Sequence, residues 1–260
     1  MKRIIALVLM VMLAFSFAAC SSKNVATSKE GTLTVGFDQN FPPMGFVDDD
    51  GEYTGFDLEL AAEVAKRLKL ELALQPIEWA SKDMELTSKN IDCVWNGFTM
   101  NNRENDYTWS EPYMANNQVF VVKSDSGIET LAGLSGKVVV VQSDSSAEAA
   151  LEEEAELVAT FGDYIKAADY NTAIMDLEAG AVDAVAMDEV VANYQIQKRG
   201  MGLVVLEEKL AEEEYGVGFL LGNEALRDKV QKALDNMAKD GTLAKISEKW
   251  FGKDVTIIGK

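Results

Sequence analysis

The sequence predicts an α/β protein of two lobes, in which each lobe is a doubly wound sheet flanked by helices and two hinge crossings join the lobes. Strand-like and helix-like periods alternate from residue 32 onward, which is typical of parallel sheets covered by helices. This alternation falls into two similar series. The last helices follow a segment, YGVGFLL at 215–221, that is similar to the segment opening the second series, QVFVVK at 118–123. The chain is therefore expected to return to the first lobe.

The first series begins with a buried strand at 32–38, because TLTVGFD is a short apolar run. The segment 57–69 carries apolar residues at the spacing of an amphipathic helix. The other elements of this series are strands at 70–77 and 91–98 and a short helix at 82–89.

The second series has the same alternation. Its strands are expected at 118–123, 137–142, 157–161, 182–187 and 202–206. Its helices are expected at 146–154, 172–179 and 188–198. After the strand at 215–221 come two helices, at 224–240 and 243–250, the second introduced by the turn pair Asp240-Gly241.

The two crossings are expected near residues 115–119 and 215–217. Lobe 1 would then hold residues 32–116 and 218–260, and lobe 2 residues 117–217. Ligands of open α/β sheets bind beyond the carboxyl ends of the strands. Two such lobes facing each other would share one cleft, which could close by a hinge motion around a ligand.

The N-terminus has the pattern of an export signal. Residues 1–20 combine a cationic start, an apolar run at 4–17 and small residues before Cys20. The run FAAC resembles a lipoprotein signal, in which Cys20 would be lipidated, and residues 21–31 would form a flexible tether. An ordinary secretory signal cleaved nearby is the alternative. Either form would place the protein outside the cytoplasm, and the first would anchor it to the membrane through lipid alone.

Composition excludes several classes of function. The 260 residues contain no histidine, which excludes a Ser-His-Asp triad, a Cys-His pair and histidine-based metal sites. No cofactor or metal is expected. A net charge of −19 disfavours binding to nucleic acid or to an anionic membrane surface. Cys93, in an apolar run, is expected to be a buried small hydrophobe.

Polar and aromatic residues follow the predicted strands of both series, as expected of groups that hold a free amino acid. Arg103 suits the carboxylate as a bidentate guanidinium, and the turn at Ser145-Ser146 offers the N-terminus of a helix. Asp188 suits the ammonium. Phe41 and Trp79 would wall the side chain. The remaining residues at these strand ends are Asp38, Asn96, Gly97 and Thr99.

Each candidate also has a structural interpretation. Ser145 to Glu148 forms a capping box, and Asp188 could cap the helix that follows it. Trp79 could belong to the core, and Arg103 could be a solvated loop cation. The joint appearance of these residues at strand ends of both series favours the binding site.

These segments resemble the extracytoplasmic solute-binding proteins of polar amino acid ABC transporters, a family with the two-lobed periplasmic-binding-protein fold of type II. The segment GFDLELAAEVA at 55–65 is similar to the signature of that family. Further matching segments are FDQNFPPMGF, NGFTMNNR, WSEPY, LSGKVVVVQSDSS, AVDAVAMD, EYGVGFLL and GTLAKISEKWFG, which together cover residues 31–252 in order.

The resemblance implies roles for particular residues. Gly55, Phe56 and Asp57 would turn the chain into the first helix, with Phe56 packing and Asp57 capping. Arg103, aided by Thr99 and Ser145, would hold the carboxylate. The ammonium would be held by Asp188 with Asn96 or Gly97, and the side chain would be framed by Asp38, Phe41, Trp79, Gln142 and Met187.

Three features depart from the family pattern. Arg103 follows Thr99 by four residues where the family has five, which could re-aim the guanidinium. Asn96 stands where the family has a small residue, and the SDSS loop at 143–146 replaces a glycine-bearing turn.

Asp38 disfavours an acidic ligand, so the expected ligand is a free L-amino acid that is polar and neutral or basic. The resemblance implies delivery to an ABC transporter permease by a monomer that performs no chemistry. The alternative is an enzyme similar to cyclohexadienyl dehydratases on the same fold. Without histidine, such an enzyme would need Glu78 or Glu111 as its general acid.

Overall fold

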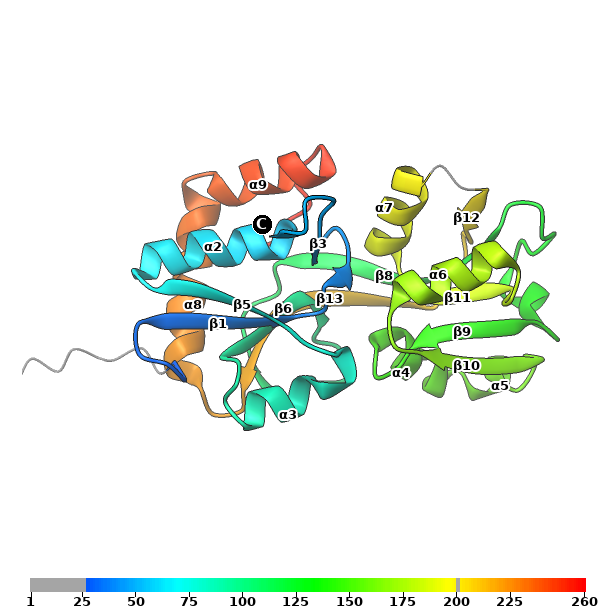
Figure 1. Ribbon diagram of the computed structural model, residues 1–260, viewed down its shortest axis with the longest axis horizontal. Coiled ribbons are helices and arrows are strands. Elements are labelled where there is room, and N and C mark those ends of the chain that lie inside the picture. Colours follow the sequence, from blue (N-terminus) through cyan, green and yellow to red (C-terminus); the bar gives the residue numbers. More distant parts are fainter. Residues whose placement is uncertain (1–26, 200–201) are drawn as a thin grey trace, which may run out of the picture.

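The structure, a computed structural model, describes residues 27–199 and 202–260. It confirms the α/β class and shows two halves joined through long strands (Figure 1). The predicted signal peptide, Cys20 and the tether up to residue 26 lie outside the described residues.

The first half is built on three parallel strands. β1 (Thr32–Phe37) lies between β5 (Glu71–Pro76) and β6 (Cys93–Thr99). On one face of these strands packs α2 (Phe56–Leu68), and α3 (Lys82–Thr87) lies on the other (Figure 1). The apolar spacing in α2 buries Leu60, Ala61 and Val64 completely, so burial of this stripe fixes the helix against the sheet.

The second half repeats the arrangement. β9 (Val138–Gln142) lies between β10 (Asp163–Ala167) and β11 (Ala184–Asp188), all three parallel. The helices of this half are, in chain order, α4 (Ser146–Glu153), α5 (Ala155–Val158), α6 (Tyr170–Ala179) and α7 (Glu189–Arg199).

Two ten-residue strands connect the halves. β8 (Met114–Lys123) and β13 (Ala211–Leu220) pair antiparallel, with Ala211 opposite Gln118 and Tyr215 opposite Met114. β8 continues beside β11 and β12 (Leu203–Val205), whereas β13 continues beside β6 and β7 (Tyr107–Trp109). The sheet is therefore mixed and continuous through the crossings, in the order β10-β9-β11-β8-β13-β6-β1-β5. The sequence predicted parallel, doubly wound sheets, and the antiparallel pairing of β8 and β13 makes the observed sheet mixed.

The last two helices pack against the first half. α8 (Glu224–Lys239) and α9 (Thr242–Phe251) pack against α2 (Figure 1). Leu226, Val230 and Leu234 form the buried stripe of α8. The first half is thus made from both ends of the described chain.

One predicted strand is wrong. Residues 157–161 do not form a strand, because α5 extends to Val158 and the strand of this region is β10. The apolar residues that suggested a strand, Leu157, Val158 and Phe161, pack against the core from the helix and the turn after it. β10 escaped prediction because it is an edge strand with largely exposed side chains. A small sheet of β2 (Asn40–Phe41), β3 (Gly45–Val47) and β4 (Tyr53–Thr54) was also not predicted.

The predicted capping role of Asp57 is also wrong. α2 begins after Gly55, and no side chain caps it. Asp57 is fully buried, and its Oδ2 accepts hydrogen bonds from the Gly97 N–H (2.6 Å) and the Tyr113 hydroxyl (2.8 Å). Phe56 packs in the core as expected. Gly55 is required because a Cβ there would lie 2.2 Å from the carbonyl oxygen of Met44.

Candidate ligand-binding site

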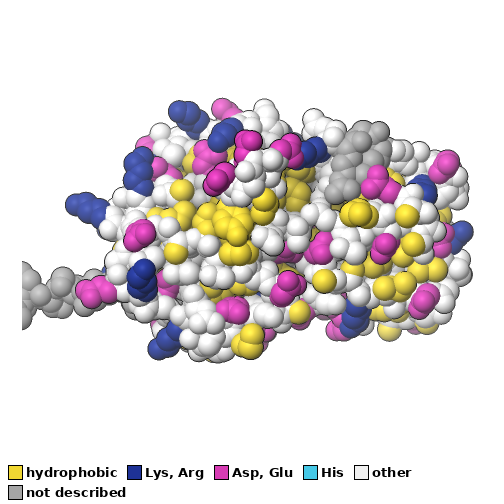
Figure 2. Space-filling view, in the orientation of Figure 1, with side chains coloured by type: hydrophobic (Ala, Val, Ile, Leu, Met, Phe, Trp, Pro, Cys, Tyr) yellow, Lys and Arg dark blue, Asp and Glu magenta, His cyan; other side chains and the backbone are white. Residues whose placement is uncertain are grey.

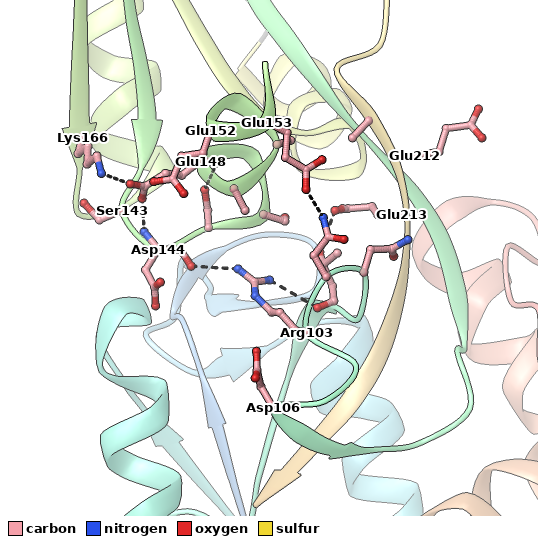
Figure 3. A pocket seen from close by; sticks show the side chains of 18 residues that line it. Arg103, Asp106, Ser143, Asp144, Glu148, Glu152, Glu153, Lys166, Glu212 and Glu213 are labelled. Atoms are coloured by element: carbon pink, nitrogen blue, oxygen red, sulfur yellow. Dashed lines mark hydrogen bonds and ion pairs between the residues drawn. The ribbon is translucent and has the colours of Figure 1, made fainter. Parts of the chain in front are cut away.

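The main cavity lies where the two halves meet and has a volume of about 640 Å³. Figure 3 shows it between α4 and the loop that follows β6. Thr99 and Arg103 line it from the first half, and Ser145 and Ser146 line it from the second. Glu213, on the crossing strand β13, lines it as well. The structure therefore brings together predicted residues from both series.

Arg103 lies at this cavity despite its short spacing from Thr99. Its Nη2 donates to the carbonyl oxygen of Asp144 (3.3 Å) and its Nη1 to that of Thr99 (3.5 Å). The guanidinium carbon stands 5.5 Å from the centre of the Phe98 ring. Arg103 thus crosses the seam between the halves, and its hydrogen-bond partners are neutral carbonyls. A carboxylate would be a stronger acceptor for it.

The turn before α4 has the predicted cap. Ser145 Oγ accepts the N–H of Glu148 (3.1 Å), so Ser145 is the N-cap residue. Ser146 Oγ accepts a hydrogen bond from Gln118 Nε2 (2.9 Å). Both serines line the cavity as well. The structural and binding interpretations of this turn are therefore compatible.

Asp38 and Gln142 join the halves beside a smaller cavity of about 220 Å³. Gln142 Nε2 donates to Asp38 Oδ2 (2.8 Å). Asp38, Glu78 and Trp79 line this cavity. Burial raises the pKa of Asp38 to about 6, opposed by hydrogen bonds from the Asn40 N–H and Gln142.

The predicted aromatic walls are largely buried. Trp79 is 8 % exposed and packs edge-on against Phe98, and its indole N–H donates to the Asp144 carbonyl oxygen (3.1 Å) across the seam. Phe41 packs against Tyr170 of the second half. Met187 is fully buried in the core and lines neither cavity.

Asn96 and Gly97 hold the end of β6 in place. Asn96 Oδ1 accepts the N–H of Asp38 (2.9 Å), whereas Gly97 donates its N–H to Asp57. Gly97 has φ +58, and a Cβ there would lie 2.9 Å from the Phe41 ring. Neither residue lines the cavities at the seam.

Asp188 ends β11 in a buried cluster of polar groups. Its Oδ1 accepts hydrogen bonds from Asn116 Nδ2 (3.1 Å), Gln118 Nε2 (2.8 Å) and the Tyr215 hydroxyl (2.6 Å). Burial and the neighbouring charge of Glu213 raise the pKa of Asp188 well above its usual range. Asp188 lines neither cavity at the seam.

Sequence reasoning missed Glu213. Its Oε1 accepts hydrogen bonds from Asn116 (2.6 Å) and Gln118 (2.8 Å), and its Oε2 accepts one from the Thr99 hydroxyl (2.9 Å). The residue lies within the acidic run EEE, and such a run usually indicates a segment exposed to solvent. The strand alternation of β13 was the available signal, because it turns Glu213 inward and leaves Glu212 and Glu214 exposed.

Lys82 was missed too. It is only 2 % exposed, and its ammonium pairs with the Asp144 carboxylate across the seam and lies 5.3 Å from the centre of the Trp79 ring. Lys82 is the first residue of α3, and nothing in the local sequence marks it as buried.

Within residues 27–199 and 202–260, no group of three or more Cys, Asp or Glu side chains is arranged to hold a metal ion. In the same ranges, no helix has the length and apolar character needed to span a membrane.

The general acids suggested for a dehydratase do not share a site. Glu78 lines the small cavity beside Asp38, whereas Glu111 lines a different cavity near the C-terminal residues of the chain.

Comparisons with known proteins agree with this geometry. The chain is 38 % identical over 231 residues to the L-cystine-binding protein TcyJ of Escherichia coli strain K12, which covers 88 % of this chain and 85 % of that protein. It is 31 % identical to the arginine-binding extracellular protein ArtP of Bacillus subtilis, covering 96 % and 98 % of the two chains.

A solved structure shows the same fold. It is an ABC uptake transporter substrate-binding protein from Streptococcus pneumoniae with bound histidine, with a TM-score of 0.84 and 36 % identity over 87 % of this chain and 94 % of that one. These relatives are named for binding rather than for catalysis, which disfavours the dehydratase alternative. The family model for bacterial extracellular solute-binding proteins, family 3, matches residues 33–253. The chain belongs to this family.

Proposed function

We propose that this solute-binding protein captures one free polar amino acid, neutral or basic rather than acidic, between its two halves and presents it to the permease of an ABC transporter. The observation that carries the proposal is the cavity at the seam. It combines a guanidinium from the first half, Arg103, with the N-terminus of α4 from the second. Both are binding groups for a carboxylate.

The charge around the cavity favours ligands that are not acidic. Seven acidic side chains line it, against two basic ones, Arg103 and Lys166. Several of the acidic residues stand on α4 and its N-terminal loop (Figure 3). An additional carboxylate on the ligand would meet this negative field at short range. Relatives named for cystine, arginine and histidine support a neutral or basic ligand.

The residues proposed to bind the ligand are divided between the halves. Arg103, Thr99, Ser145 and Ser146 hold the carboxylate, and Asp188 with Asn96 or Gly97 serves the ammonium. The side chain of the ligand is framed by Asp38, Phe41, Trp79, Gln142 and Met187.

Closure of the two halves brings together residues that contact each other only when the halves meet. Asp144 of the second half meets Trp79, Lys82 and Arg103 of the first. Farther along the seam, Asn102 donates to Glu153 (2.7 Å). A ligand that touches both halves adds to these contacts and shifts the population toward the closed form.

The proposed lobes are residues 32–116 with 218–260, and 117–217, with β8 and β13 as hinges.

We also propose that residues 1–20 are a lipoprotein signal, that Cys20 carries the lipid and that residues 21–31 tether a monomeric binding domain to the membrane. Charged side chains of both signs are spread over the face shown in Figure 2.

A thermal-shift panel tests the proposal. The purified protein is heated with each common amino acid and with L-cystine, and ligands are recovered unchanged afterwards. Stabilisation should grow with ligand concentration relative to Kd, for neutral or basic amino acids and not for glutamate or aspartate. Absence of any stabilisation, or a preference for glutamate, would contradict the proposal.

A further inference from the structure

We propose that Glu213 is the residue that receives the ligand's ammonium directly, with Asp188 as a second carboxylate behind it. This inference rests on the proposed function and adds a residue that neither the sequence patterns nor the family resemblance assigned.

Position distinguishes the two carboxylates. Glu213 is 5 % exposed but lines the main cavity together with Thr99 and Arg103. Each carboxylate accepts three protein hydrogen bonds, but Asp188 is more deeply buried and does not line this cavity. A ligand in this cavity therefore meets Glu213 first.

The two carboxylates form a pair. The amide nitrogens of Asn116 and Gln118 each donate to both Asp188 Oδ1 and Glu213 Oε1. Among the described residues, neither carboxylate forms an ion pair with a lysine or arginine. Buried negative charge is costly without a cation, and the raised pKa of Asp188 reflects that cost. A cationic group on the ligand would therefore stabilise the pair.

The pair is also surrounded by ionisable hydroxyls rather than by cations. Tyr170 from α6 and Tyr215 from β13 face it, and burial raises the pKa of both phenols well above the usual range. The raised pKa values favour the neutral phenols, of which Tyr215 donates to Asp188 Oδ1 (2.6 Å) and Tyr170 has no hydrogen-bond partner for its hydroxyl within the described part of the chain. A ligand ammonium would be the positive charge that this cluster lacks.

An unpaired acceptor lies beside the pair, on a residue that does not itself line the cavity. Gln118 is fully buried, and its Oε1 has no hydrogen-bond partner, although its Nε2 donates to Ser146, Asp188 and Glu213. Buried acceptors are rarely left unsatisfied. An ammonium carries three donors and no acceptor, so it can serve Glu213 and Gln118 Oε1 together.

The spacing suits an amino acid zwitterion. Thr99 contacts both ends of the site, because its carbonyl oxygen accepts from Arg103 and its hydroxyl donates to Glu213. The Arg103 guanidinium and the Glu213 carboxylate therefore lie on either side of Thr99. An α-carboxylate on Arg103 places the α-ammonium toward Glu213.

The test compares Glu213→Gln with Glu214→Gln by isothermal titration calorimetry against the twenty common amino acids and L-cystine. Both variants remove one negative charge from β13, but Glu214 is exposed and does not line the cavity. Removing a buried charge that binds an ammonium weakens affinity strongly, so Glu213→Gln should weaken binding about 30-fold or more. Glu214→Gln should stay within about threefold of wild type, because exposed charges contribute little.

A second readout separates recognition from folding. The tightest-binding amino acid is compared with its 2-hydroxy analogue, in which a hydroxyl replaces the ammonium. The wild type should strongly prefer the amino acid, Glu213→Asp should retain part of that preference, and Glu213→Gln should lose most of it. A general folding defect would weaken both ligands equally and leave the ratio unchanged, which would overturn the inference.

The outcomes also separate the two proposals. If the wild type binds an amino acid and Glu213→Gln binds it equally well, Glu213 is not the ammonium acceptor, and the proposed function stands. If the wild type binds none of the panel, both proposals fail.

Discussion

Asp38 and Gln142, 104 positions apart in the chain, meet through a 2.8 Å hydrogen bond across the seam. Asp38 follows β1 of the first half, and Gln142 ends β9 of the second. The two strand ends that the alternation predicted to share one cleft are therefore in direct contact. A substitution of either residue should therefore change how readily the two halves close around a ligand.

Gln142→Glu should weaken ligand binding at pH 7.5, because the introduced carboxylate would face Asp38. The pKa of Asp38 is raised to about 6, so Asp38 is protonated at pH 5 and can donate to the new carboxylate. The ratio of variant Kd to wild-type Kd, measured by calorimetry at both pH values, should fall on acidification. A ratio that does not change with pH would show that the two groups are not coupled in solution.

Lys82→Met should weaken ligand binding about tenfold, because the Lys82–Asp144 ion pair spans the seam. The free energy of unfolding should change by about 1 kcal/mol or less, because the Asp144 carboxylate left behind is half-exposed and can be solvated. Asp144→Asn is the matched variant, because it keeps the carbonyl that accepts from Trp79 and Arg103. The losses in the double variant should be less than additive. Additive losses would place the two side chains in independent roles.

Arg103→Lys should weaken binding by about 10- to 100-fold, because a lysine ammonium cannot form the bidentate contact of a guanidinium. Kd from calorimetry gives the measurement, and Arg227→Lys, on α8 of the first half, is the control. Unchanged affinity in Arg103→Lys would mean that the short Thr99–Arg103 loop directs the guanidinium away from the ligand.

Asp57→Asn should flatten the pH dependence of stability. Burial raises the pKa of Asp57 to about 7, above its value of 3.8 in the unfolded chain. The native state therefore holds the proton more tightly, and stability falls as pH rises from about 4 to 7, by about 4 kcal/mol in total. The asparagine oxygen can still accept from Gly97 and Tyr113.

Urea unfolding of the wild type and Asp57→Asn at pH 4.5 and 7.5 measures this effect. The stability of the wild type relative to the variant should decrease between the two pH values. A constant difference would show that Asp57 does not titrate in this range.

Most helices and strands could be predicted in the correct order because their apolar residues recur with the period of a helix or of a strand. In β1, α2 and α8, the apolar residues fall at the positions whose side chains are buried. The exceptions are elements with little burial, such as β10, and the short strands β2 to β4. Their conformation depends on neighbouring strands rather than on their own residues.

The site was partly predictable for the same reason. Residues at strand ends, such as Asp38 and Arg103, could be placed from the alternation. Lys82 could not, because it lies in a polar segment and pairs with Asp144 of the opposite half. Glu213 was missed because it lies in an acidic run, and the inward alternation of β13 was its one signal. Asp57 was misassigned because its partners, Gly97 and Tyr113, are distant in sequence.

The most direct measurement is a crystal structure with the amino acid that stabilises the protein most. We predict one ligand at the seam, with its carboxylate on Arg103 and the N-terminus of α4 and its ammonium on Glu213, backed by Asp188. A ligand bound elsewhere, for example in the 570 Å³ cavity beside Trp250, or one touching a single half, would contradict this prediction.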